Sequence, residues 1–151
     1  MNQLTDVIRS SGNPNIILIP CAEQGQDESV LIKKGNLFLK GQQNILFDIH
    51  AYEKWLLVSN SEIERRLKLL QDHNLPFIFG EIAPINASLL MNPRFFLEKA
   101  YTLGTSICAW VWKYDGSDQN ALLTEDGFPN DNNNNSWGTT YQSLSRRERM
   151  P

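Results

Sequence analysis

Residues 75–81 read Leu-Pro-Phe-Ile-Phe-Gly-Glu, a short apolar run that ends on a carboxylate. Three similar apolar runs lie elsewhere in the chain, at Ile16–Ile19, Ile45–Ile49 and Ile107–Val111. With Phe77 taken as the start of the central run, successive runs begin 29, 32 and 30 residues apart. A βαβ unit takes about 30 or more residues, so each interval can hold one strand and one covering helix. The spacing therefore predicts four parallel strands that alternate with helices.

The segments between these runs carry helix signals. Apolar residues at helical spacing predict a helix over residues 3–11. The Ser-x-x-Glu pattern of residues 61–64 is a capping box, and Asn92-Pro93 is a typical helix start. Apolar residues also recur over residues 27–40, but an interruption at Gly35 predicts a broken helix there.

Composition favours one soluble, globular domain. A chain of 151 residues can bury one core, and 41% hydrophobic with 21% charged residues does not fit a disordered chain. The net charge of −3 gives no reason to expect nucleic acid or an anionic membrane as a partner. Residues 1–11 lack the apolar segment of a signal peptide, and localisation stays open. Cys21 and Cys108 are expected to be small core residues rather than a disulfide framework.

The predicted fold class is α/β, a partial (β/α)8 barrel. A doubly wound open sheet uses the same units, but no strand is followed by the glycine-rich loop of its nucleotide-binding forms. A complete barrel takes about 250 residues, so four strands in 151 residues predict half a barrel. A polar, asparagine-rich loop over residues 126–136 and a last helix within residues 136–150 complete the expected order.

Glu81 is the candidate catalytic residue. Right-handed crossovers place the carboxyl ends of parallel strands on one side, where barrel enzymes carry their active sites. Carboxylates at that position are what glycoside hydrolysis requires. His50 and Tyr52 are two residues apart, so both side chains point the same way from the neighbouring strand and can reach Glu81 or a sugar hydroxyl. For His50, a satisfied core histidine is an equal alternative.

Trp110 and Trp112 repeat the two-residue spacing on the fourth predicted strand. Indole faces stack on the apolar faces of pyranose rings, which makes both residues candidates for substrate binding, although a strand tryptophan is more often a core residue. A polar cluster around Glu23 follows the first strand, and we expect it to cap the next helix rather than to bind a sugar.

These residues together resemble the C-terminal half of glycoside hydrolase family 5, the cellulase and β-mannanase group. The matching segments are residues 44–52 (Asn-Ile-Leu-Phe-Asp-Ile-His-Ala-Tyr), residues 75–81 and residues 109–112 (Ala-Trp-Val-Trp), within a similarity that runs from about Ile16 to Gly138. The resemblance implies one partial catalytic domain over residues 1–151, with strands five to eight of the TIM barrel and no metal or cofactor.

The resemblance also implies roles for single residues. Glu81 corresponds to the catalytic nucleophile of a retaining β-glycosidase, after strand seven. His50 and Tyr52 match the His-x-Tyr of strand six, with Tyr52 as the partner of the nucleophile. Trp110 matches the strand-eight tryptophan beside the scissile bond. The expected ligand is a β-linked oligo- or polysaccharide of the glucan or mannan type, with no nucleic acid and no membrane.

One part of the family's machinery is missing from the sequence. The family's acid/base glutamate follows an asparagine at the end of strand four, and Asn-Glu-Pro does not occur here. A retaining mechanism needs two carboxyl groups about 5–5.5 Å apart, so we expect the chain alone to be inactive on unactivated polysaccharide. Ile82-Ala83 and Val111 also depart from the family's usual residues. Two alternatives stay open: a non-catalytic carbohydrate-binding remnant, and a truncated gene product that needs its N-terminal half or self-associates.

Overall fold

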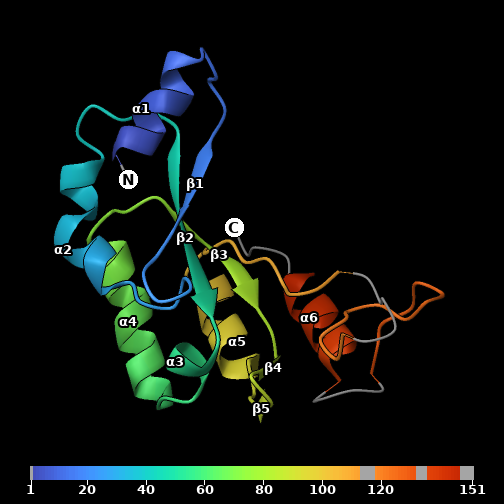
Figure 1. Ribbon diagram of the computed structural model, residues 1–151. Helices are drawn as coiled ribbons and strands as arrows, with labels where there is room; N and C mark the ends of the chain where they lie inside the picture. The colour runs from blue at the N-terminus through green and yellow to red at the C-terminus, as the bar shows by residue number, and fades with distance from the viewer. Residues whose placement is uncertain (1, 113–117, 132–135, 147–151) are drawn as a thin grey trace.

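The computed structural model describes residues 2–112, 118–131 and 136–146 of the chain. Strands β1 (Ile17–Pro20), β2 (Ile45–Ala51) and β3 (Phe77–Ile82) form a parallel sheet in that order, and the short strands β4 (Ile85–Asn86) and β5 (Leu89–Leu90) pair antiparallel after it (Figure 1). The helices are α1 (Asn2–Ser10), α2 (Ser29–Phe38), α3 (Glu53–Leu56), α4 (Asn60–Asp72), α5 (Arg94–Thr102) and α6 (Trp137–Ser145). The predicted α/β class with a parallel sheet is confirmed. Residues 132–135 of the predicted asparagine-rich loop lie outside the described residues.

The fourth predicted strand is the main correction. Residues 106–110 run beside β3, where Cys108 N–H donates to the carbonyl of Phe79 at 2.8 Å, but the segment contributes only an isolated parallel bridge between Ile107 and Phe79. The next residue, Val111, hydrogen-bonds instead to Asn120 and Leu122, at 3.0 and 2.8 Å. The backbone is drawn away from the sheet by these bonds before a regular strand can form.

Two helix predictions also need correction. Helix α2 continues through Gly35 without a break. Glycine fits there because a Cβ would lie 2.7 Å from the Leu75 side chain, so its role is close packing rather than ending the helix. Helix α4 begins before the predicted Ser61 cap. Its N-cap is Ser59, whose hydroxyl accepts the N–H of Glu62 at 3.2 Å, so the Ser-x-x-Glu pattern that caps the helix is residues 59–62.

The sheet has one face that the helices cover and one that they leave open. Along β2, residues 45, 47, 49 and 51 are buried, whereas residues 46, 48 and 50 between them are only partly covered. On the covered face the Phe79 ring meets Trp55 of α3 and Phe96 of α5 edge-on, with ring centroids 5.0 and 4.8 Å apart. This aromatic cluster joins β3 to two helices, so the functional side chains must come from the other face.

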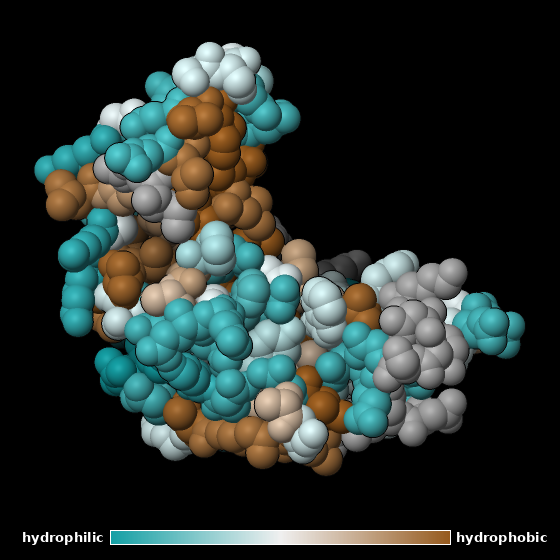
Figure 2. Space-filling model, in the orientation of Figure 1, coloured by the Kyte–Doolittle hydropathy of each residue, from teal (hydrophilic) through white to brown (hydrophobic). Residues whose placement is uncertain are grey.

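Apolar side chains near the start of the chain are exposed, both along β1 and on α1. Ile16 and Leu18 beside and within β1 are 62% and 50% exposed, and Leu4 and Val7 of α1 are exposed as well. Figure 2 shows hydrophobic residues gathered in the upper part of the molecule, where Figure 1 places α1 and β1. Parallel sheets are normally covered on both faces, so this surface is one that a covering element would bury.

The two cysteines are free, and only one of them is partly buried. Cys21 is half-buried, and burial together with the carboxylates of Glu28 and Asp48 raises the pKa of its thiol to about 12. Cys108 is exposed, which corrects the expectation of a core residue: along its segment Ile107 takes the buried side and Cys108 the opposite one. In the described part of the chain, no helix has the length and apolar character needed to cross a membrane.

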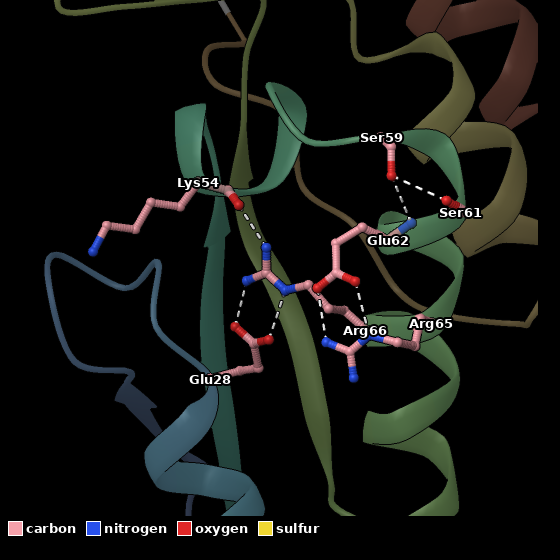
Figure 3. Close-up of polar contacts among 7 residues, drawn as sticks. All are labelled: Glu28, Lys54, Ser59, Ser61, Glu62, Arg65 and Arg66. Atoms are coloured by element: carbon pink, nitrogen blue, oxygen red, sulfur yellow. Dashed lines mark hydrogen bonds and ion pairs between the residues drawn. The ribbon is translucent and has the colours of Figure 1, made fainter.

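Arg66 holds α4 against the loop after β1 (Figure 3). Its guanidinium donates to both carboxylate oxygens of Glu28, at 2.5 and 2.7 Å, and to the carbonyl of Lys54 at 2.5 Å. The same group lies 3.7 Å from the centroid of the Trp55 ring. Both charged side chains are 11% exposed, so their charges are largely shielded from water. This contact fixes the segment that leads out of β2 and carries Tyr52.

We predict that Arg66→Ala lowers the free energy of unfolding by about 3–5 kcal/mol, because it leaves the Glu28 carboxylate buried without its partner. The measurement is urea denaturation followed by circular dichroism. The matched control is Arg65→Ala, since Arg65 pairs with Glu62 on the exposed side of the same helix and its loss should barely move the midpoint. Equal effects of the two substitutions would contradict the structural role of Arg66.

Candidate active site

Three of the predicted residues meet at the carboxyl ends of β2 and β3. The hydroxyl of Tyr52 donates to Oε2 of Glu81 at 2.8 Å, and Nδ1 of His50 lies 3.4 Å from the same oxygen. The His50 and Tyr52 rings stand edge to face with their centroids 6.4 Å apart. The expected contacts of both side chains with Glu81 are therefore present, and His50 is not a core residue.

A bulge in β3 turns Glu81 toward these partners. The β2–β3 register pairs Ile49 with Phe79 and His50 with Glu81, which leaves Gly80 as an extra residue on β3. In a regular strand residues 79 and 81 would share one face, and Glu81 would point with Phe79 into the aromatic cluster. The extra residue reverses the alternation, so Glu81 lies on the open face and Ile82 is fully buried.

Asp48 satisfies the backbone at this bulge. Its Oδ1 accepts the N–H of Gly80 at 3.0 Å, and its Oδ2 lies 3.1 Å from Nε2 of His50. A Cβ on Gly80 would lie 2.0 Å from Asp48 Oδ1, so no larger residue fits without moving the carboxylate. Asp48 was not among the predicted site residues. Its two-residue spacing from His50, which repeats that of His50 and Tyr52, is the signal that could have found it.

The side chains of His50, Tyr52 and Glu81 line an open pocket of about 290 Å³. The lining residues are Gln24, Gln26, His50, Tyr52, Glu81, Asn86 and Trp110. Trp110 reaches the pocket as predicted and is 43% exposed, and its indole N–H donates to Asp118 at 3.1 Å. Trp112 does not line the pocket and is 70% exposed, because the chain has already turned away from the sheet at Val111.

The amide side chains of Gln24, Gln26 and Asn86 form an amide rim of the pocket, which the sequence analysis did not predict. Glu53 accepts hydrogen bonds from Gln26 at 2.7 Å and from Asn86 at 2.8 Å, and these bonds fix the two amides at the pocket. The cluster around Glu23 was predicted to cap the next helix. Asp27 does so, because it accepts the N–H of Ser29 at the start of α2. The prediction was wrong for Glu23, which pairs with Lys54. Gln24 and Gln26 reach the pocket because positive-φ residues 23–25 turn the loop back over it.

The protonation of two groups follows from their surroundings. Burial, with the hydrogen bond to Glu81 as the next cause, raises the pKa of Tyr52 far above that of a free phenol. The phenol therefore stays neutral and acts as a donor to the Glu81 carboxylate. Burial acts to raise the pKa of Glu53, but hydrogen bonds from Asn86 and Gln26 outweigh it and hold the pKa below its usual value. Glu53 is therefore charged where it accepts the hydrogen bonds of Gln26 and Asn86.

The described lining of the pocket contains one carboxylate, that of Glu81. Its contacts with Tyr52 and His50 both use Oε2. Over residues 2–112, 118–131 and 136–146, no cluster of three His, Cys, Asp or Glu side chains is placed to hold a metal ion. What the pocket offers is one oriented carboxylate, an imidazole, a phenol, amides and an indole.

Comparison with known proteins identifies the family. The sequence model for cellulase (glycosyl hydrolase family 5) matches residues 1–116. The chain belongs to glycosyl hydrolase family 5. No curated protein matches it. β-Mannanases are among the similar solved structures. The β-mannanase from Streptomyces thermolilacinus has a TM-score of 0.76 at 20% identity, over 99% of this chain and 51% of its own.

Two further mannanases give the same result. The catalytic domain of the mannanase from Streptomyces sp. SirexAA-E has a TM-score of 0.71 at 21% identity, over 90% of this chain and 43% of its own. The β-mannanase from Thermomonospora fusca has a TM-score of 0.71 at 18% identity, over 90% of this chain and 45% of its own. These likenesses show the fold: the chain matches part of a family 5 TIM barrel and spans about half the length of these proteins.

We predict that Gly80→Ala lowers the free energy of unfolding by about 1–3 kcal/mol, because the new methyl group is forced against Asp48. Urea denaturation of the single and double variants measures the effect. In an Asp48→Ala background the obstacle is gone, so the same Gly80→Ala change should cost less. An equal cost in both backgrounds would mean that Asp48 does not occupy the space beside Gly80.

Proposed function

We propose that Glu81 is the nucleophile of a retaining β-glycosidase site. The observation that carries the proposal is the hydrogen bond from a neutral Tyr52 phenol to Glu81, at the carboxyl ends of adjacent parallel strands in a family 5 chain. A donor to the charged form of a carboxylate favours that form, which is the one that attacks. A purely carbohydrate-binding role is not favoured, because it gives no reason to aim one carboxylate into the pocket.

The reaction would proceed in two displacements. The Tyr52 hydroxyl donates to Oε2, so Oε1 of Glu81 is the oxygen that attacks the anomeric carbon while the bond to the leaving glycosidic oxygen breaks. A second carboxylic acid protonates that oxygen, and water then hydrolyses the glycosyl-enzyme intermediate. Glu81 is the one carboxylate among the described pocket residues, so the second group has to come from outside this part of the chain.

The proposed substrate is a β-linked polysaccharide. Two similar structures hold mannohexaose, those of the β-mannanases from Streptomyces thermolilacinus and Thermomonospora fusca. The half-exposed indole of Trp110 offers a flat surface for a pyranose ring, and the amides of Gln24 and Asn86 can hydrogen-bond its hydroxyls. Trp112 lies outside the pocket and is a candidate contact for the more distant sugar units of a polysaccharide.

We propose that the chain supplies strands five to eight of the barrel, with residues 106–110 in the place of strand eight although they form only one bridge to β3, and that further (β/α) units cover its open face. The support is the match to about half of each mannanase and the exposed apolar side chains beside β1. On this view the chain alone has one of the two required carboxylates. Hydrolysis of unactivated glycan then depends on the missing units.

Covalent trapping tests the proposed nucleophile without a general acid. We predict that 2-deoxy-2-fluoro-β-mannosyl fluoride or its gluco analogue labels Glu81, because Oε1 bonds to the anomeric carbon and fluoride leaves unassisted. Mass spectrometry of peptic peptides locates the label, while release of reducing sugar from β-mannan and β-glucan by the same sample should be absent. Polysaccharide turnover that Glu81→Gln abolishes would overturn the claim that a second carboxylate is missing.

The matched controls for trapping are Glu81→Gln, which should lose the label, and Glu64→Gln on the exposed side of α4, which should keep it. Glu64 pairs with Lys99 and lies away from the pocket. A label on another residue, or no label in the wild-type chain, counts against Glu81 as a nucleophile presented by these strands.

We predict that the isolated chain self-associates through its open apolar face. Ile16→Lys/Leu18→Lys should shift it toward the monomer mass of 17.3 kDa, because it places charges on the exposed surface. Size-exclusion chromatography with light scattering measures the mass. Leu90→Lys, at an exposed apolar residue of β5 elsewhere on the surface, is the control and should leave association unchanged. A monomeric wild-type chain would show that this face needs no cover.

A further inference from the structure

Asp48 joins the strand bulge to the histidine of the site. One carboxylate oxygen accepts the N–H of Gly80 at 3.0 Å and the other lies 3.1 Å from Nε2 of His50. The side chains of Asp48 and His50 are 16% and 18% exposed, so both contacts are partly shielded from bulk water. Asp48 is not among the pocket-lining residues, but its contact partner His50 is.

The position of the ring leaves little freedom for another arrangement. A Cβ on Gly25 would lie 2.5 Å from Cγ of His50, which shows that the imidazole packs directly against the backbone of that loop. The backbone N–H of His50 also donates to the carbonyl of Gly25 at 2.8 Å. The ring is therefore held between Gly25 on one side and two carboxylates at its edges.

The hydrogen-bonding partners decide which ring nitrogen carries a proton. A carboxylate can only accept, so each nitrogen that faces one is favoured as a donor, and a neutral imidazole has a single N–H to give. Nε2 is closer to Asp48, at 3.1 Å, than Nδ1 is to Glu81, at 3.4 Å. Oε2 of Glu81 also already accepts the Tyr52 hydroxyl. The arrangement therefore favours the proton on Nε2.

We propose that Asp48 is a positioning residue that keeps a proton on Nε2 of His50. Nδ1 then carries no proton, lies on the side of Glu81, and can accept a hydrogen bond from a bound hydroxyl. The catalytic meaning rests on the proposed function of Glu81. The proton arrangement itself does not, and it can be measured on the chain without substrate.

Asp48→Asn makes a sharp test because the structure fixes how the new amide must lie. The N–H of Gly80 requires an acceptor, so the amide oxygen stays at the Oδ1 position and the amide NH2 takes the place beside His50. Nε2 then faces a donor and must accept, which drives the proton to Nδ1. A change of one atom in Asp48 should thus invert the tautomer of His50.

Nuclear magnetic resonance of ¹⁵N-histidine reads the tautomer directly. The chain has two histidines, and His73 serves as an internal reference because its Nδ1 lies 2.8 Å from the carbonyl of Leu69 and must be the donor there. Spectra are recorded on the chain without a histidine tag at about pH 9, above the ordinary imidazole pKa of about 6.5. Asp72→Asn, beside His73, is the matched control.

The expected result is that Nε2 of His50 is protonated in the wild-type chain and that the protonated and unprotonated ¹⁵N signals exchange positions in Asp48→Asn. His73 should keep its Nδ1 proton in all three proteins, which also reports that they are folded. A wild-type His50 with an unprotonated Nε2 overturns the proposal, and so does an Asp48→Asn chain in which Nε2 stays protonated. If Asp48→Asn does not fold, the wild-type spectrum alone decides, because it must show the Nε2 proton.

Discussion

The hydrogen bond from the N–H of Gly80 to the Asp48 carboxylate is the contact on which the candidate site depends. A bulge removes one backbone N–H from the ladder, and an unsatisfied N–H in a partly buried strand is unfavourable. Asp48 supplies the missing acceptor from the neighbouring strand. With the bulge stable, the alternation of β3 reverses after Phe79, and Glu81 leaves the aromatic cluster for the pocket face.

The same carboxylate links the backbone to the chemistry of the site. Asp48 holds the bulge with one oxygen and faces His50 with the other, while Glu81 sits between His50 and the Tyr52 phenol. Because Asp48, His50 and Tyr52 alternate along one strand and the segment after it, a single extended stretch delivers all three partners. In this family 5 chain, two adjacent parallel strands are thus enough to orient the Glu81 carboxylate.

The parallel α/β order and the proximity of His50 and Tyr52 to Glu81 could be predicted from the sequence, because strand period and two-residue spacing are local properties. The sequence analysis did not predict the bulge in β3, although a glycine within an apolar strand, here Gly80, is a signal for one. It predicted a fourth strand at Ile107–Val111, but hydrogen bonds to residues 120 and 122 divert that segment. The amide rim was also missed, since Glu53 organises Gln26 and Asn86 across 27 and 33 residues of sequence.

The measurement that tests the account most directly is the set of nuclear Overhauser contacts from the Glu81 side chain in the wild-type protein. The account predicts contacts to the rings of Tyr52 and His50, which lie on the open face of the sheet. Contacts to the rings of Trp55 and Phe96 instead would mean that β3 runs without a bulge and that Glu81 points with Phe79 toward the helices. That result would contradict the proposed catalytic role.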